Sequence, residues 1–269
     1  MHRVYRLHRG ESALNDSRGR CLRVVVLSDL HCGAWYGLTP PEYQGGEPER
    51  IQSAMWKWYA ETMAKLQPID LLIVNGDAID GKSDKSGGRE LITADRRIQT
   101  EIAARCIVEG IPDKTLIIEG TGYHTGNDEA WEEVLADRIG ADFDRHGTVE
   151  CGGVRFDVKH HIGGSSIPHG RHTAIARDSL WLDKWADKGV QGKADILLRG
   201  HVHYFGYNGN ADRLCMTLPC LQLWTSYGST RCSGTIDVGL VSFDCEDGRY
   251  DWHAHLFDMS IGKSTVRRY

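Results

Sequence analysis

The chain has 269 residues, a net charge of −5 and 41% hydrophobic residues, which is ordinary for a soluble globular enzyme with a substantial core. No run of Lys or Arg stands out, so the composition argues against an extended nucleic-acid-binding surface. Residues 1–20 lack the apolar segment of a secretory signal, no apolar run has the length of a membrane span, and the scattered cysteines contain no C-x-x-C pair. We therefore expect a cytoplasmic protein with reduced thiols.

In chain order, residues 1–21 are expected to form a polar N-terminal extension and residues 22–269 a single domain. Apolar runs predict strands at 22–27, 71–74 and 115–118, and turn signals and helical spacing predict helices at 48–67, 90–109 and 127–139. Short strands are then predicted at 154–158, 196–198, 214–218 and 236–243, with one helix at 174–188. This order predicts an α/β fold in which two mixed β-sheets pack as a sandwich flanked by helices.

Clusters of acidic residues and histidines follow four of the predicted strands. The clusters contain Asp29 and His31, Asp77 and Asp80, His160 and His161, and His201 and His203. Because ligands bind at the carboxyl ends of strands in an α/β sheet, the four clusters are expected to meet in one site. Carboxylate oxygen and imidazole nitrogen without thiolate suit manganese, iron, zinc or nickel better than a closed structural zinc site.

Each cluster has a simpler interpretation when it is taken alone. Asp29 and Asp77 are also typical of turns, and Asp80 fits a turn or a supporting role. The alternate pair His201 and His203, in contrast, has little packing rationale in a loop. His160 shares strand parity with the apolar residues before it, so we favour it over His161 as the residue that faces the site.

The ordered motifs D-x-H, G-D-x-x-D, a G-x-H-like element, H and G-H-x-H extend from Asp29 to His203. In this order they are similar to the motifs of the calcineurin-like metallophosphoesterase family. The resemblance implies a four-layer α/β/β/α fold with two divalent metal ions, manganese first, with iron, zinc or nickel as alternatives. It places Asp29, His31, Asp77 and His203 on one ion, and it has Asp77 bridge to a second ion held by His201 and by His160 or His161.

One motif departs from that family. The usual Gly-Asn-His-Asp/Glu is replaced by Gly120-Thr121-Gly122-Tyr123-His124, a Gly-Thr-x-x-His variant that resembles phage and prophage proteins. The Asn that would bind the second metal is missing, so that ion lacks a ligand unless Thr121 or water supplies one. His124 is expected to keep the role beside the phosphate and is the candidate general acid.

The resemblance implies hydrolysis of a phosphodiester or phosphomonoester by a hydroxide that bridges the two ions. Arg171 and His172, just after a ligand-bearing strand, are candidate donors to the phosphate oxygens. The expected substrate is a small phosphorylated molecule, with a nucleotide as the leading example. Two other functions stay open: a metal-binding scaffold or partner subunit that has lost catalysis, and a nuclease on polymeric DNA or RNA, which the acidic net charge disfavours.

Overall fold

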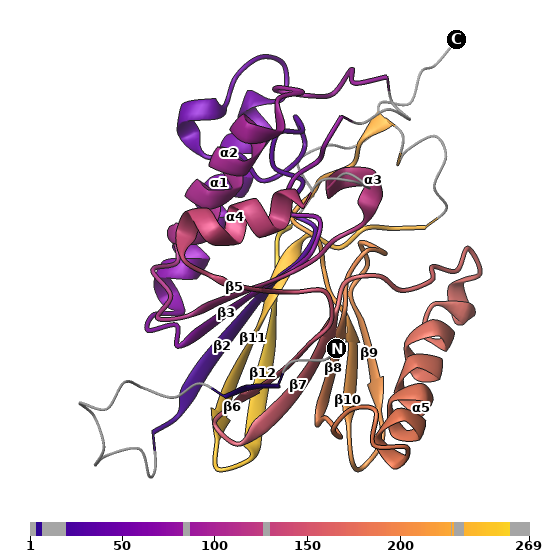
Figure 1. Cartoon of the computed structure of the whole chain (residues 1–269). Coiled ribbons are helices and arrows are strands. Elements are labelled where there is room, and N and C mark those ends of the chain that lie inside the picture. The colour runs from indigo at the N-terminus through magenta and orange to yellow at the C-terminus, as the bar shows by residue number, and fades with distance from the viewer. Residues whose placement is uncertain are drawn as a thin grey trace.

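The computed structural model describes residues 4–6, 20–82, 87–125, 130–226, 228 and 234–258. Within these residues, two six-stranded sheets pack face to face, and helices cover both outer surfaces (Figure 1). The strand orders are β12-β11-β2-β3-β4-β5 and β1-β6-β7-β8-β10-β9. This arrangement confirms the predicted fold class.

The first sheet is parallel through its centre and antiparallel at one side. Its parallel strands are β2 (Leu22–Leu27), β3 (Leu71–Asn75), β4 (Thr115–Ile118) and β5 (Asp142–Asp144). Strand β11 (Gly239–Glu246) joins β2 in the antiparallel sense, and β12 (Arg249–Leu256) closes that side. All five residues of β3 are buried, as expected for a central strand covered on both faces.

The second sheet mixes both directions. It contains β1 (Val4–Arg6), β6 (Gly147–Cys151), β7 (Val154–Lys159), β8 (Ile196–Arg199), β9 (Gly206–Gly209) and β10 (Leu214–Thr217). Strand β8 lies parallel to both β7 and β10. Strand β1 pairs with β6, so three residues of the predicted N-terminal extension belong to a sheet. So short a strand has no period that the sequence could reveal.

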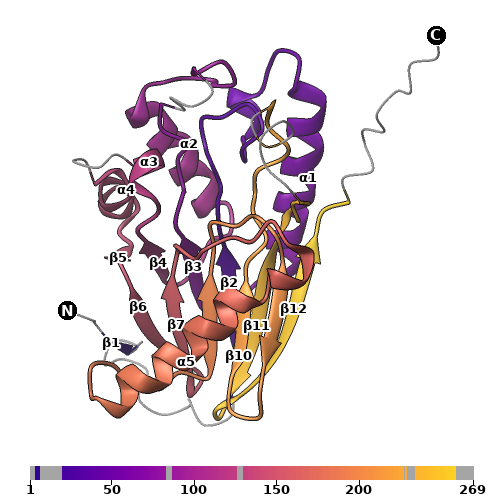
Figure 2. The same ribbon diagram turned by 90° about the vertical axis from the view of Figure 1, so that its right-hand side faces the viewer.

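Three apolar clusters separate the four layers. Helices α1 (Glu49–Lys65), α2 (Arg96–Val108) and α4 (Trp131–Ile139) pack on the first sheet, and α5 (Thr173–Asp187) lies across the second (Figure 2). Side chains alternate along β3: Leu72 and Val74 belong to the cluster with the helices, and Leu71 and Ile73 to the cluster between the sheets. None of the helices in the described ranges combines the length and apolarity of a membrane span.

Helix ends follow local capping. Helix α2 begins at Arg96 and not near residue 90, because the Asp95 side chain accepts a hydrogen bond from Arg97 N at 2.8 Å. Helix α4 ends at Gly140, whose φ of 67° suits a left-handed cap. The predicted start of α4 near Asn127 lies outside the described residues, and the short helix α3 (Gly122–Thr125) was not predicted.

Candidate metal centre

The loops that follow five strands meet at one edge of the sandwich. Strands β2, β3 and β4 are parallel in one sheet and β7 and β8 in the other, so their carboxyl ends converge. These loops carry Asp29 and His31, Asp77 and Asp80, His124, His160, and His201 and His203. The structure therefore brings together every predicted ligand cluster.

The backbone turns sharply at the predicted ligands. Asp29, His31, Asp77, His201 and His203 have φ values of 52°, 47°, 49°, 70° and 56°, all in the left-handed region. Residues other than glycine are uncommon there, and each such conformation costs about 1–3 kcal/mol. Hydrogen bonds between the loops hold the turns; His31 N, for example, donates to Asp77 O at 3.0 Å.

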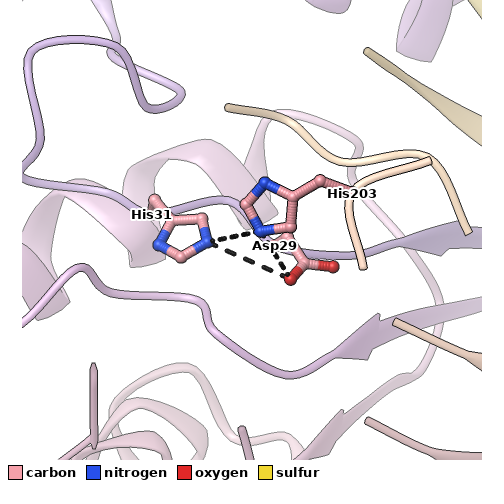
Figure 3. A group of neighbouring side chains, drawn as sticks. All are labelled: Asp29, His31 and His203. Atoms are coloured by element: carbon pink, nitrogen blue, oxygen red, sulfur yellow. Dashed lines mark hydrogen bonds and ion pairs between the residues drawn. The ribbon is translucent and has the colours of Figure 1, made fainter. Parts of the chain in front are cut away.

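Asp29, His31 and His203 form the first group (Figure 3). Asp29 Oδ1 lies 3.1 Å from His203 Nε2 and 4.0 Å from His31 Nε2, and the two Nε2 atoms are 3.2 Å apart. His31 Nδ1 lies 3.1 Å from Asp80 Oδ1. Because a carboxylate accepts, His31 donates from Nδ1, and its Nε2 lone pair faces the group.

Asp77, His160 and His201 form the second group. His160 Nδ1 donates to Asn75 O at 2.6 Å, which leaves its Nε2 lone pair toward the group. That Nε2 is buried without a hydrogen bond, yet lies 3.0 Å from Asp77 Oδ2. A buried nitrogen of this kind beside a carboxylate oxygen fits a metal ion. His161 is exposed and stacks near His201 at 4.7 Å between ring centroids, outside both groups.

A carboxylate links the two groups. Asp29 Oδ1 is 3.1 Å from His203 Nε2 in the first group and 3.8 Å from His160 Nε2 in the second. Both oxygens of Asp29 also accept from His201 N at 3.2 Å. The resemblance assigns the bridge to Asp77, whereas Asp29 is the carboxylate that reaches histidines of both groups within 4.0 Å in the described structure.

The electrostatics of the groups favour positive charge. Burial alone raises the pKa of Asp29, but the charges of His203 and His160 outweigh it and hold that pKa below its usual value. Burial lowers the pKa of His160, but the charges of Asp77 and Asp29 raise it to about 10. Burial, helped by the charge of His160, lowers the pKa of His201 to about 4. The raised pKa of His160 reflects the preference of the two buried carboxylates, Asp77 and Asp29, for a positive charge at this position.

The altered motif after β4 contacts Asp77 directly. Thr121 donates its backbone N–H to Asp77 Oδ1 at 2.6 Å and its hydroxyl to the same oxygen at 3.0 Å. His124 Nδ1 donates to Asp80 O at 2.8 Å, and its Nε2 lies 3.9 Å from Asp77 Oδ2. The His124 ring meets the His31 ring edge-on, with centroids 4.5 Å apart.

A cavity of about 630 Å³ opens beside the two groups, within the range of small-molecule sites. One part of its wall contains His31, Asp77, Asp80, His124, His201 and His203, and another contains Tyr123, Ser165, Ser166, Leu223, Trp224 and Ile236. The candidate general acid and the predicted ligands therefore share a cavity with aromatic, apolar and hydroxyl side chains.

No protein-family model and no curated protein matches the chain. Among solved structures it is similar to a single mutant of Vps29 from Entamoeba histolytica, with 14% identity over 88% of this chain and 100% of the other and a TM-score of 0.43. A predicted phosphoesterase from Streptococcus pneumoniae has 14% identity over 88% and 99% of the chains, with a TM-score of 0.40. An archaeal phosphodiesterase has 13% identity over 87% and 100%, with a TM-score of 0.45. The resemblance to the calcineurin-like metallophosphoesterases rests on the ordered motifs and on the sandwich that joins them.

Of the two predicted substrate donors, Arg171 contacts residues of the cavity wall. Arg171 and His172 are not among the described residues of its wall. The Arg171 guanidinium lies 4.7 Å from the centre of the Tyr204 ring and donates to Thr235 Oγ1 at 3.2 Å. Tyr204 and Thr235 both line the cavity, so Arg171 contacts two residues of the cavity wall. Its role and that of His172 as substrate contacts stay predictions.

Glu132 is a buried residue of the centre that sequence reasoning missed. It lies in the first turn of α4, is 1% exposed, and accepts hydrogen bonds from Ala78 N at 2.8 Å and from Gly120 N. Burial and the nearby charge of Asp77 raise the pKa of its carboxyl to about 8, against the effect of the two N–H donors. An acidic residue in a first helical turn is common as a partner of the helix dipole, so no local signal distinguished it.

Proposed function

We propose that this protein is a metal-dependent phosphoesterase that hydrolyses a phosphodiester or phosphomonoester. The observation that carries the proposal is the meeting of two groups of carboxylate and imidazole ligands, Asp29 with His31 and His203 and Asp77 with His160 and His201, beside one cavity. These side chains come from four separate strand ends, and turns or core packing do not explain their convergence.

Two divalent ions are the proposed cofactors. Asp29, His31 and His203 would hold one ion; Asp77, His160 and His201 would hold the other, with one carboxylate shared. The donor set suits manganese, iron, zinc or nickel. His160 Nε2, which is buried without a hydrogen bond 3.0 Å from Asp77 Oδ2, supports the second position. When bound, such ions polarise a phosphoryl group and lower the pKa of water toward neutrality.

His124 is the proposed general acid. Its Nδ1–H is held by Asp80 O, which turns Nε2 toward Asp77 at the cavity wall. When the ring carries its second proton, Nε2–H can donate to the leaving oxygen. Asp80 also accepts from His31, so one residue sets the orientation of a ligand and of the acid.

The proposed substrate is a small phosphorylated molecule, with a nucleotide as the leading example. The cavity volume of about 630 Å³ supports a ligand of this size. Tyr123 and Trp224 lie in its wall, and stacking of a base on an aromatic side chain contributes about 1–3 kcal/mol.

A metal-binding scaffold without catalysis is the competing function. The observation in its favour is Thr121, which stands where the resembled family has a ligand Asn and whose hydroxyl is occupied by Asp77. The second group then offers the three protein ligands Asp77, His160 and His201. An incomplete second position would bind metal without supporting hydrolysis.

Hydrolysis of bis(p-nitrophenyl) phosphate and p-nitrophenyl phosphate with added manganese tests the proposal. We expect hydrolysis by the wild type and by Asp187→Asn, which changes an exposed carboxylate on α5. Asp77→Asn should be inactive. Metal bound in stoichiometric amounts without hydrolysis of either ester, across manganese, iron, zinc and nickel, would instead support the scaffold.

A further inference from the structure

We propose that Glu132 is a positioning residue that fixes the distance between two loops of the metal centre, an inference that rests on the metal-dependent function proposed above. The side chain is 1% exposed and reaches from α4 to the loops after β3 and β4. One carboxylate oxygen accepts from Ala78 N at 2.8 Å, and the other accepts from Gly120 N. A single side chain therefore ties both loops to one helix.

The two N–H groups lie next to the residues that matter in each loop. Ala78 follows the predicted ligand Asp77, and Gly120 precedes Thr121, which donates twice to Asp77 Oδ1. The loops are in close contact, because a Cβ placed on Gly120 would lie 2.3 Å from both Asp77 N and Asp77 Oδ1. Any change in the separation of the loops would shift Asp77 relative to its Thr121 donors.

The contact requires two acceptors in one side chain. A carboxylate offers two oxygens, whereas the amide of Gln offers one oxygen and one NH₂ group. In Glu132→Gln, the NH₂ group would face a backbone N–H donor of Ala78 or Gly120 and push that loop away. The neighbouring Glu133 lies on the same helix with an exposed side chain, and it provides a matched control.

A positioning role differs from a purely structural one in what it changes. Loss of a structural contact lowers the thermal stability of the metal-free protein and leaves the metal affinity of the folded protein unchanged. Loss of a positioning contact weakens metal binding while the protein is fully folded. Residues that orient metal ligands typically change metal affinity or activity about 10–100-fold when replaced.

The experiment compares wild type, Glu132→Gln and Glu133→Gln by calorimetric titration with Mn²⁺ below the melting temperature of each protein. Amide hydrogen exchange at Ala78 and Gly120 is measured on the metal-free forms. We expect Glu132→Gln to bind Mn²⁺ about 10–100-fold more weakly, with faster exchange at Ala78 or Gly120. Glu133→Gln should match the wild type. Wild-type Mn²⁺ affinity in folded Glu132→Gln would overturn the proposal.

If Glu132→Gln does not fold, Glu132→Asp replaces it, because Asp keeps the two carboxyl oxygens but is one methylene too short to reach both N–H groups. Unchanged Mn²⁺ affinity in that variant would also overturn the positioning role. The proposed function is tested separately. If the wild type binds Mn²⁺ but hydrolyses no phosphoester, the phosphoesterase function is rejected, and the Mn²⁺ affinities of the Glu132 variants still test the positioning role. A wild type that binds no divalent ion would reject both.

Discussion

Thr121 donates both its backbone N–H and its hydroxyl to Asp77 Oδ1, at 2.6 and 3.0 Å. In the family that the motifs resemble, an Asn at this place binds the second metal. In this chain the hydroxyl instead holds the carboxylate of a predicted ligand. Thr121 is therefore interpreted as a residue that orients the predicted ligand Asp77, and not as a metal ligand itself.

Thr121→Val tests this interpretation, because it removes the hydroxyl and keeps the shape of the side chain. A hydrogen bond to a charged group contributes about 1.5–3 kcal/mol, so we expect Mn²⁺ affinity to fall by about one to two orders of magnitude. Thr121→Ser keeps the hydroxyl and should stay close to the wild type. Calorimetric titration measures both variants. Equal affinity for Val and Ser at this position would contradict the orienting role.

The identity of the bridging carboxylate can be read from metal stoichiometry. The resemblance predicts that Asp77 bridges the two ions, so that Asp77→Asn lowers metal occupancy at both positions. The contacts of Asp29 with His203 at 3.1 Å and with His160 at 3.8 Å instead predict that Asp29→Asn has this effect. Elemental analysis after dialysis against Mn²⁺ distinguishes them, with Asp187→Asn as the exposed control. One ion retained in Asp77→Asn and none in Asp29→Asn would assign the bridge to Asp29.

His124→Ala should leave the metal content unchanged and slow turnover about 10²–10⁴-fold, the usual range for a positioned acid. The loss should be smaller for nitrophenolate leaving groups, which need little protonation, and largest for alkoxides. His169→Ala removes an exposed histidine and serves as the control. Loss of one ion, with equal slowing for both kinds of leaving group, would show that His124 is a ligand.

A buried ion pair beneath α5 should govern acid stability. Asp157 and Arg199 are each 1% exposed, with Arg199 Nη2 2.8 Å from Asp157 Oδ1. Burial raises the pKa of Asp157, but the Arg199 charge and a hydrogen bond from His146 outweigh it, so the net pKa is lowered. The stabilisation is therefore complete above the unfolded value of about 3.9, and it is lost as the pH falls through the lowered pKa.

Asp157→Asn should reduce the free energy of unfolding by about 1.5–3 kcal/mol at pH 7, because it removes one of the two carboxylates, Asp157 and Asp178, that pair with the buried Arg199 guanidinium. The difference from the wild type should shrink as the pH falls below about 4. Glu61→Gln, which breaks an exposed pair with Lys57 at 3.9 Å, should cost about 0.5 kcal/mol or less. Urea unfolding across pH 2–8 measures these values, and an Asp157→Asn deficit as large at pH 2 as at pH 7 would contradict the sign.

Much of the architecture could be predicted from the sequence because the central strands are apolar runs such as Leu71–Asn75, bounded by glycine and proline signals. The ligand clusters could be predicted for the same reason, since each lies directly after such a run. Strand parity also favoured His160 over His161, and the structure buries the first and exposes the second.

Other features depend on tertiary contacts that leave no local pattern. The role of the Glu132 carboxylate depends on its hydrogen bonds with Ala78 and Gly120, which precede it by 54 and 12 residues. The position of Arg171 against Tyr204 depends on the path of the loop before α5. Strand β1 forms by pairing with β6, and its own three residues carry no pattern that predicts it.

The left-handed turns at Asp29, His31, Asp77, His201 and His203 have a consequence for protein engineering. A designer who copied only these five side-chain identities onto the strand ends of another scaffold would reproduce the donor atoms without the turns that aim them. Ordinary loops would leave the imidazoles and carboxylates splayed apart, because most residues avoid this backbone region. A transplant must therefore carry whole loop conformations, with the inter-loop hydrogen bonds that hold them.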